Sequence, residues 1–182
     1  MKLDKTEILY WRDKYNKEED LSTEEIEGTE EELRERFKKY QYMTKDDLIK
    51  VIKWKFQDSR LKGRQKQTLN LIKPIDPHFI KDISRLAFKA ENEKISFILL
   101  DGIKGVGPAI TSVILSFYDP NNYGVLDIHS WRELFGKEPN DLFTNHEYLS
   151  KFLDKLRELS SKFGMPCRDI EKALFEKNKD ES

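Results

Sequence analysis

The sequence predicts an all-helical protein. Apolar residues recur every three or four positions along most of the 182-residue chain, which is the spacing of one helix face. Several segments open with capping residues and end before glycine or proline, as helices do. No alternating run is long enough to indicate a strand. With 37% hydrophobic and 12% aromatic residues, the chain has enough apolar side chains for a core of domain size.

The first half of the chain contains the expected helices with the clearest start signals. Thr29 and Glu32 have the spacing of a capping box. Another helix is expected from Thr44, and Asp76 before a proline is a typical N-cap. A polar connection over 57–64 is followed by a helix that ends at residue 72. The apolar stripes are, in order, Ile8, Trp11 and Tyr15; Leu33, Phe37 and Tyr40; Leu48, Val51, Ile52 and Phe56; Phe79, Ile83, Leu86 and Ala87.

The second half continues the helical pattern. A helix marked by Ile95, Ile98 and Leu99 precedes a glycine-containing turn, and another helix follows that turn. A long helix is expected over 145–163, and a short one over 169–177. We interpret the aromatic stripes throughout as core, with no cofactor assigned to any of them.

Charge is distributed unevenly along a chain whose net charge is −1. Residues 44–73 hold 9 Lys/Arg against 3 Asp/Glu, a net charge of +6. A patch of one sign can meet phosphates even on a nearly neutral protein. A solvated lysine-rich face is the alternative interpretation.

Several classes of protein are excluded by composition. No purely apolar run is longer than four residues, as at 97–100, so no segment is expected to span a membrane. The charged N-terminus is unlike a signal peptide. The single cysteine, Cys167, leaves no intrachain disulfide and no four-cysteine iron–sulfur or zinc site. The three histidines, His78, His129 and His146, do not have metal-ligand spacing. We therefore expect an intracellular, cytoplasmic protein.

The turn near residue 105 has the pattern of a phosphate-binding hairpin. Its residues are Ile103, Lys104, Gly105, Val106, Gly107 and Pro108. Glycine permits a sharp bend and a close approach of the backbone to a ligand, and proline suits the first turn of the next helix. The N–H groups at that helix start would bind an anion without reading sequence. An ordinary helix–turn–helix corner is the alternative.

Asp127 follows Gly107 by twenty residues and stands between two apolar residues. A helix is expected to begin there, so taken alone Asp127 is interpreted as an N-cap.

Together, the hairpin and Asp127 resemble the helix-hairpin-helix superfamily of DNA base-excision glycosylases, which includes endonuclease III, the adenine glycosylase and the 8-oxoguanine glycosylases. The family has a Gly-hydrophobic-Gly hairpin and an essential aspartate about twenty residues later. Its hydrophobic-Asp-x-His-x-aromatic-Arg pattern is matched by Leu-Asp-Ile-His-Ser-Trp-Arg at 126–132. The close match covers residues 99–134.

This resemblance implies a two-lobed helical glycosylase fold. One lobe would combine the N- and C-terminal helices, about 1–43 and 131–182, and the other, about 44–130, would carry the hairpin. Asp127 would be the catalytic carboxylate, in a cleft between the lobes. The partner would be double-stranded DNA with a damaged or mispaired base, and the protein would be a monomer. No cofactor is expected, although a structural monovalent cation at the hairpin remains open.

The chain departs from the family at one important position. Members that also cleave the strand carry a lysine two residues after the second hairpin glycine, where this chain has Ala109. Alanine cannot form a Schiff base with the sugar, so the resemblance implies a monofunctional glycosylase without lyase activity.

Further DNA contacts are expected around the polar connection that follows residue 56. The family uses the corresponding stretch for DNA-contacting and wedge residues. Trp54 is a candidate for stacking on a base, with a plain core residue as the alternative. The candidate contacts are Trp54, Gln57, Arg60, Lys62, Arg64 and His129. Two other functions stay open: a non-catalytic DNA-binding member that uses Asp127 only as a cap, and a helical protein-interaction module.

Overall fold

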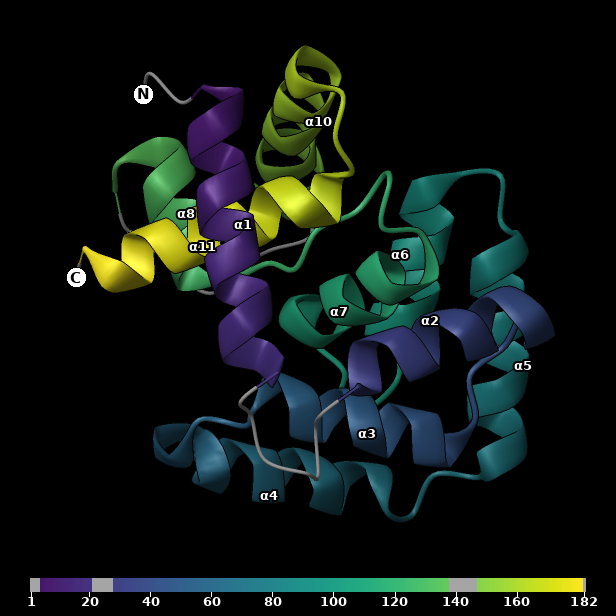
Figure 1. The fold of residues 1–182 in the computed structure, drawn as a ribbon. Helices are drawn as coiled ribbons and strands as arrows, with labels where there is room; N and C mark the ends of the chain where they lie inside the picture. Colours follow the sequence, from purple (N-terminus) through teal and green to yellow (C-terminus); the bar gives the residue numbers. More distant parts are fainter. Residues whose placement is uncertain (1–3, 21–27, 138–146, 182) are drawn as a thin grey trace. The chain divides into compact units, whose positions relative to one another are not determined.

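The computed structural model describes residues 4–20, 28–137 and 147–181. These residues form helices and turns and no strand, which confirms the all-α prediction (Figure 1). The elements are α1 (Lys5–Asp20), α2 (Thr29–Tyr40), α3 (Lys45–Lys55), the 3-10 turn η1 (Ser59–Leu61), α4 (Lys62–Ile72), α5 (Pro77–Lys89), α6 (Glu93–Asp101), α7 (Pro108–Tyr118), α8 (Ile128–Phe135), the π-helical turn η2 (Tyr148–Phe152), α10 (Leu153–Phe163) and α11 (Cys167–Asp180). Positions 145 and 146, where the helix over 145–163 was expected to begin, lie outside the described residues. None of the helices in the described part of the chain is long and apolar enough to cross a membrane.

The chain divides into two compact units. Unit 1 combines residues 1–22 with 119–182, and unit 2 is the continuous stretch 23–118. The family resemblance implies lobe boundaries later in the chain, near residues 43 and 130. The first boundary differs because α2 packs against α3 and α7 and so belongs to unit 2. The second differs because the chain leaving α7 bonds to the start of α11, where the N–H of Arg168 donates to the carbonyl of Pro120 at 3.0 Å.

The core of unit 2 surrounds α7. All residues of α7 from Ile110 to Phe117 are buried, and α2, α3 and α6 pack on this helix. Phe117 meets Trp54 of α3 edge to face, with 5.0 Å between the ring centroids. At the end of α7, the Tyr118 ring stacks on Phe88 of α5 at 4.2 Å.

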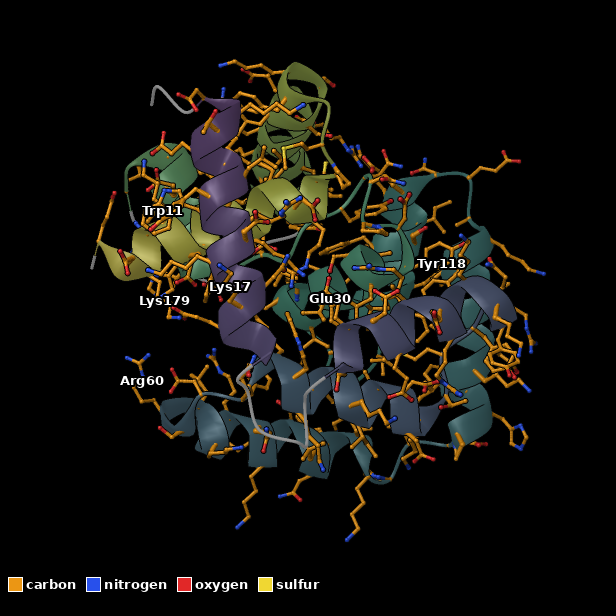
Figure 2. The ribbon with its side chains drawn as sticks, in the orientation of Figure 1. Trp11, Lys17, Glu30, Arg60, Tyr118 and Lys179 are labelled. Carbon is orange, nitrogen blue, oxygen red and sulfur yellow. The ribbon has the colours of Figure 1, made fainter. Side chains whose placement is uncertain are left out.

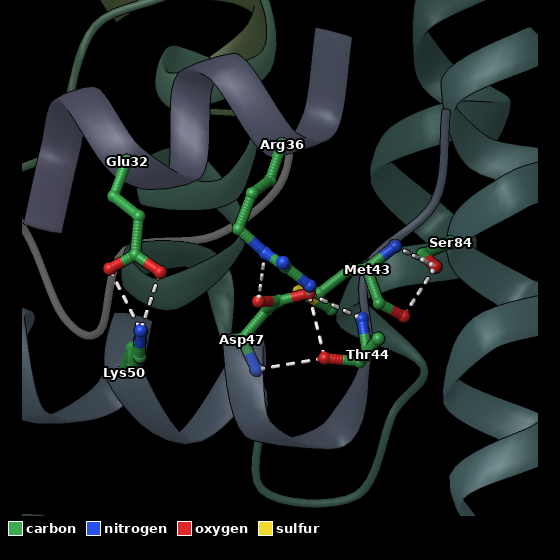
Figure 3. Close-up of polar contacts among 7 residues, drawn as sticks. All are labelled: Glu32, Arg36, Met43, Thr44, Asp47, Lys50 and Ser84. Carbon is green, nitrogen blue, oxygen red and sulfur yellow. Dashed lines mark hydrogen bonds and ion pairs between the residues drawn. The ribbon is translucent and has the colours of Figure 1, made fainter. Parts of the chain in front are cut away.

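The start of α3 is fixed by short-range polar contacts (Figure 3). The Thr44 hydroxyl accepts the N–H of Asp47 at 3.2 Å, and the Asp47 carboxylate accepts the N–H of Thr44 at 2.9 Å. This reciprocal capping box confirms the expected helix start. The same carboxylate accepts the Arg36 guanidinium of α2 at 2.8 Å, so the cap also ties α2 to α3.

The capping box expected for α2 is wrong. The N-cap is Gly28, in the left-handed conformation at φ 70, and no side chain caps the helix. Thr29 is the first helical residue and is buried. The Glu32 carboxylate is bonded to the Lys50 ammonium at 2.6 Å (Figure 3). The Glu32 side chain, which the local pattern predicts to cap α2, thus pairs with a lysine of α3 instead.

The face of α5 that packs inward is also different from the expected stripe. Ser84, Ala87 and their neighbours Ile80 and Phe88 are buried, whereas Phe79 is 47% and Leu86 58% exposed. Ser84 holds this face of α5 inward, because its hydroxyl accepts the N–H of Met43 at 2.8 Å (Figure 3).

The core of unit 1 surrounds α11. Helices α1, α8 and α10 all pack on this helix, and eight of its residues are buried: Cys167, Arg168, Ile170, Glu171, Lys172, Ala173, Leu174 and Glu176. Four of these eight are charged, which is unusual for a buried helix face. Among the described residues of this unit, the fully buried aromatic side chains are Trp131, Tyr148 and Phe152.

Candidate functional site

The hairpin has the expected helix–turn–helix geometry in unit 2. Helix α6 ends at Asp101 and α7 begins at Pro108. Two backbone bonds close the turn: the N–H of Ile103 donates to Leu100 at 3.1 Å, and the N–H of Val106 donates to Ile103 at 2.8 Å. Ile103 and Val106 are 1% and 3% exposed, so these two side chains anchor the turn and leave Lys104 exposed.

The two hairpin glycines have different structural roles. Gly105 has φ +91, and a Cβ built on it would lie 3.0 Å from the Leu71 Cβ and 3.5 Å from the Thr68 carbonyl oxygen. Both the backbone conformation and the close approach of α4 therefore require glycine there. Gly107 does not have a positive φ, and no atom lies within 4 Å of an added Cβ. Gly107 therefore borders open space.

Four backbone donors of the hairpin have no acceptor within the described part of the chain. They are the N–H groups of Lys104, Gly105, Gly107 and Ala109. The first bonds of α7 are made by Ile110 and Thr111, whose N–H groups both donate to the carbonyl of Gly107 at 3.0 Å. Donors at a helix start next to its positive dipole end are the groups that bind phosphate in other proteins.

Helix α4, which lies beside the hairpin at Gly105, carries three basic residues. Leu71 and Thr68 of α4 contact Gly105. Arg64 lies seven residues before Leu71, two helical turns, and so shares its face. Lys62 and Lys66 are also exposed, but they lie roughly 140–180° around the helix axis from Leu71. Of these three cations, Arg64 is the one on the hairpin side.

The polar connection before α4 supplies two of the remaining candidates. Gln57 is exposed. Arg60 points away from its turn into solvent (Figure 2) and donates to the Asp58 carboxylate at 2.6 Å. The side-chain hydrogen bonds from Arg60 lower the pKa of Asp58 to about 2. Because the charge of Arg60 is matched by this carboxylate, Arg60 is a weaker candidate for phosphate than Arg64.

Trp54 is a core residue. It is 4% exposed, and its ring is packed against Phe117 of α7. This corrects the stacking interpretation, since a ring enclosed between two helices offers no face to a base. The basic residues Lys53 and Lys55 flank it in sequence, but they lie on other sides of α3.

Asp127 lies in unit 1 as the N-cap of α8. Its Oδ1 accepts the N–H of His129 at 3.0 Å, and the residue is half-buried. The expected cap is therefore confirmed. The cap places a partly exposed carboxylate at the positive end of a helix, where its ionised form is favoured.

His129 is held within unit 1 by two contacts. Its Nδ1 lies 3.0 Å from the Asn178 side-chain oxygen, and its ring meets Phe175 edge to face at 5.2 Å. Both partners lie on α11. These contacts give His129 a structural role between α8 and α11.

Sequence reasoning missed the buried residues that surround the Asp127 segment. Arg168 and Glu171 of α11 are each 1% exposed, and Glu171 bonds to Ser130 and to the backbone of Val125. A signal was present, because both charged residues fall among apolar residues on one helix. The partners of Glu171 near Asp127, however, are 41 and 46 positions away in sequence, which local patterns do not reveal.

Within the described residues, neither unit shows a group of metal ligands. In the part of the chain that the structure describes, no three His, Cys, Asp or Glu side chains are placed to hold a metal ion. Cys167 is buried at the start of α11, and this burial raises the pKa of its thiol.

Comparison of the chain with protein-family models, with curated proteins and with solved structures found no match.

Proposed function

We propose that the protein is a monofunctional DNA glycosylase that removes a damaged or mispaired base. The hairpin over 103–108 would hold the DNA backbone, Arg64 would add a phosphate contact, and Asp127 would be the catalytic carboxylate. The observation that carries the DNA-binding part is the packing of α4 on Gly105. It brings the basic helix next to the open N–H groups of the hairpin.

The chemistry follows from the charge that develops during base release. Cleavage of an N-glycosidic bond builds positive charge on the sugar, as in glycoside hydrolysis. A carboxylate beside the anomeric carbon stabilises this charge and can orient a water molecule. Asp127 suits this role because the N-terminus of α8 favours negative charge at its position. The target base must first leave the stack, which costs least for damaged or mispaired bases.

One observation favours a second function. The Asp127 carboxylate caps α8 through His129, which is sufficient to account for an aspartate at this position. A protein that binds DNA through the hairpin, with Asp127 only as a cap, would share every other feature. The two functions differ in one measurable property, the release of a base.

A base-release screen tests the proposal. Duplexes that each carry one lesion or one mismatch are incubated with the full chain and then treated with alkali, which cleaves the strand at abasic sites. The proposal predicts cleavage of at least one duplex and none of the matched undamaged duplex. Binding to duplexes without base release from any of them would support the non-catalytic function instead.

The alanine at position 109 gives a separate prediction. Because Ala109 has no amine, no Schiff base forms with the sugar at this position. We expect no covalent protein–DNA adduct when borohydride is added during the reaction, as checked by denaturing gel electrophoresis. An adduct with an abasic duplex would show that another amine reaches the sugar, and the protein would then not be monofunctional.

A further inference from the structure

A buried ion pair lies next to the segment that carries Asp127. Arg168 and Glu171 of α11 are each 1% exposed, and the Arg168 guanidinium donates to the Glu171 carboxylate. Removing two charges from water is costly, and apolar residues of similar volume often stabilise a fold as well or better. The pair is therefore poorly explained by stability alone, and its contacts indicate what else it does.

Glu171 bonds to the chain on both sides of Asp127. Its Oε2 accepts the N–H of Val125 at 3.3 Å, two residues before Asp127. Its Oε1 accepts the hydroxyl of Ser130 at 3.0 Å, three residues after it. Val125 is 3% exposed and Ser130 is fully buried. One carboxylate thus fixes both ends of the segment 125–130.

Close packing restrains the same segment further. A Cβ on Gly124 would lie 2.6 Å from the Leu156 Cδ1 and 3.0 Å from the Glu171 Cβ, so the backbone passes directly over α10 and α11. The Tyr148 hydroxyl donates to the carbonyl of Gly124 at 3.3 Å. The segment is therefore held from three elements of unit 1.

Arg168 is itself held from a second side. Its guanidinium donates to the Tyr15 hydroxyl of α1 at 3.2 Å and lies 5.4 Å from the centroid of the Tyr15 ring. This leaves the guanidinium little freedom to turn away from Glu171. Tyr15 of α1 thus contacts Arg168, and Arg168 contacts Glu171. Glu171 in turn contacts the residues on either side of Asp127.

We propose that Glu171 is a positioning residue for Asp127, with Arg168 holding Glu171 in place. This inference rests on the proposed function, in which Asp127 is the catalytic carboxylate. A catalytic group must be held close to its productive geometry by residues behind it. Glu171 does this through the backbone at Val125 and the side chain of Ser130, without touching the substrate.

The test replaces the pair by apolar residues, Arg168→Met together with Glu171→Leu. Such a double variant is expected to fold, because it leaves no uncompensated buried charge. It removes the acceptor for Val125 and Ser130, so the segment loosens. We expect the amide of His129, which bonds to Asp127, to exchange its hydrogen faster. Base release in a single turnover should fall by about 10²-fold, the size of effect expected for a misplacement of about 1 Å.

A control comes from the same helix. Glu176 is 2% exposed and pairs with Lys14 at 3.8 Å and Lys179 at 3.5 Å, residues outside segment 125–130. Glu176→Gln therefore changes a buried carboxylate of α11 without removing a contact of Glu171. Hydrogen exchange at His129 and base release should both match the parent protein.

Two readouts separate this inference from the proposed function. A folded double variant with parental exchange at His129 and parental base release would overturn the positioning role, as would faster exchange with unchanged base release. If the parent protein releases no base, or if Asp127→Asn releases it normally, the proposed function fails. In that case hydrogen exchange alone shows whether Glu171 holds segment 125–130. Glu171 would then be a structural residue and not a positioning residue for catalysis.

Discussion

Gly105 and Gly107 are two residues apart in the same turn, but their backbones are in different conformations. Gly105→Ala places a Cβ in the left-handed region, which costs about 1–2 kcal/mol, and brings it 3.0 Å from Leu71. Gly107→Ala meets no atom within 4 Å and should change the free energy of unfolding by less than about 0.5 kcal/mol. Urea unfolding of both variants checks this difference. Equal losses of stability would contradict the geometry of the turn.

The same contrast decides how the hairpin is tested for DNA binding. A substitution at Gly105 would combine strain with any effect on binding. Gly107 offers the open side of the turn, so a bulky residue there blocks the approach of a phosphate to the backbone while the fold is kept.

Single residues were predictable where their partners are close in sequence. Asp76 and Asp127 are N-caps, as expected, because each bonds to a backbone N–H two residues away. For Trp54 the sequence left open a choice between core packing and base stacking, since its burial depends on Phe117, which lies on another helix. Glu171 was missed for the same reason.

Helix α4 allows the phosphate contact to be tested with a control on the same helix. Arg64→Gln removes a cation on the hairpin side, whereas Lys62→Gln removes one from the opposite side. We expect Arg64→Gln to weaken duplex binding at all sequences and to lower the slope of log K against log salt concentration by about 1. Lys62→Gln should leave this slope near the parental value.

Binding titrations over a range of salt concentrations measure this effect. Equal losses for the two variants would show that α4 attracts DNA only through its total charge. An unchanged slope for Arg64→Gln would remove this residue from the interface.

At the scale of elements, start signals that include proline were reliable. Helices α5 and α7 begin at Pro77 and Pro108 as expected, because proline is favoured in the first turn and excluded from the interior. The start of α2 was misread, since the side chain of Glu32 is taken by Lys50. The inward face of α5 was misread because Ser84 bonds to the distant backbone of Met43.

At the scale of the whole molecule, unit 2 is continuous in sequence and has its own core around α7. We therefore expect a fragment of residues 23–118 to fold alone and to unfold cooperatively. Trp54 is the only tryptophan in this fragment and is 4% exposed, so its fluorescence should shift to longer wavelength on unfolding. A fragment with the emission of exposed tryptophan and no cooperative transition would contradict this expectation.

The division into units shows what sequence patterns do not contain. The chain ends were expected to share a lobe on the basis of the family resemblance, and α1 and α11 do pack together in unit 1. The boundaries depend on which helices contact each other. Those contacts join residues far apart in sequence, so helical periodicity carries no information about them.

The proposed reaction depends on the charge of the Asp127 carboxylate, and Asp127→Asn tests it most directly. Asparagine caps a helix about as well as aspartate, so stability should change by less than about 1 kcal/mol. The loss of charge opposite the developing sugar cation should slow base release by about 10²–10³-fold. The measurement is single-turnover base release on the duplex found in the screen, with thermal melting in parallel. Base release at the parental rate by the folded variant would show that Asp127 is only a cap and would contradict the glycosylase mechanism.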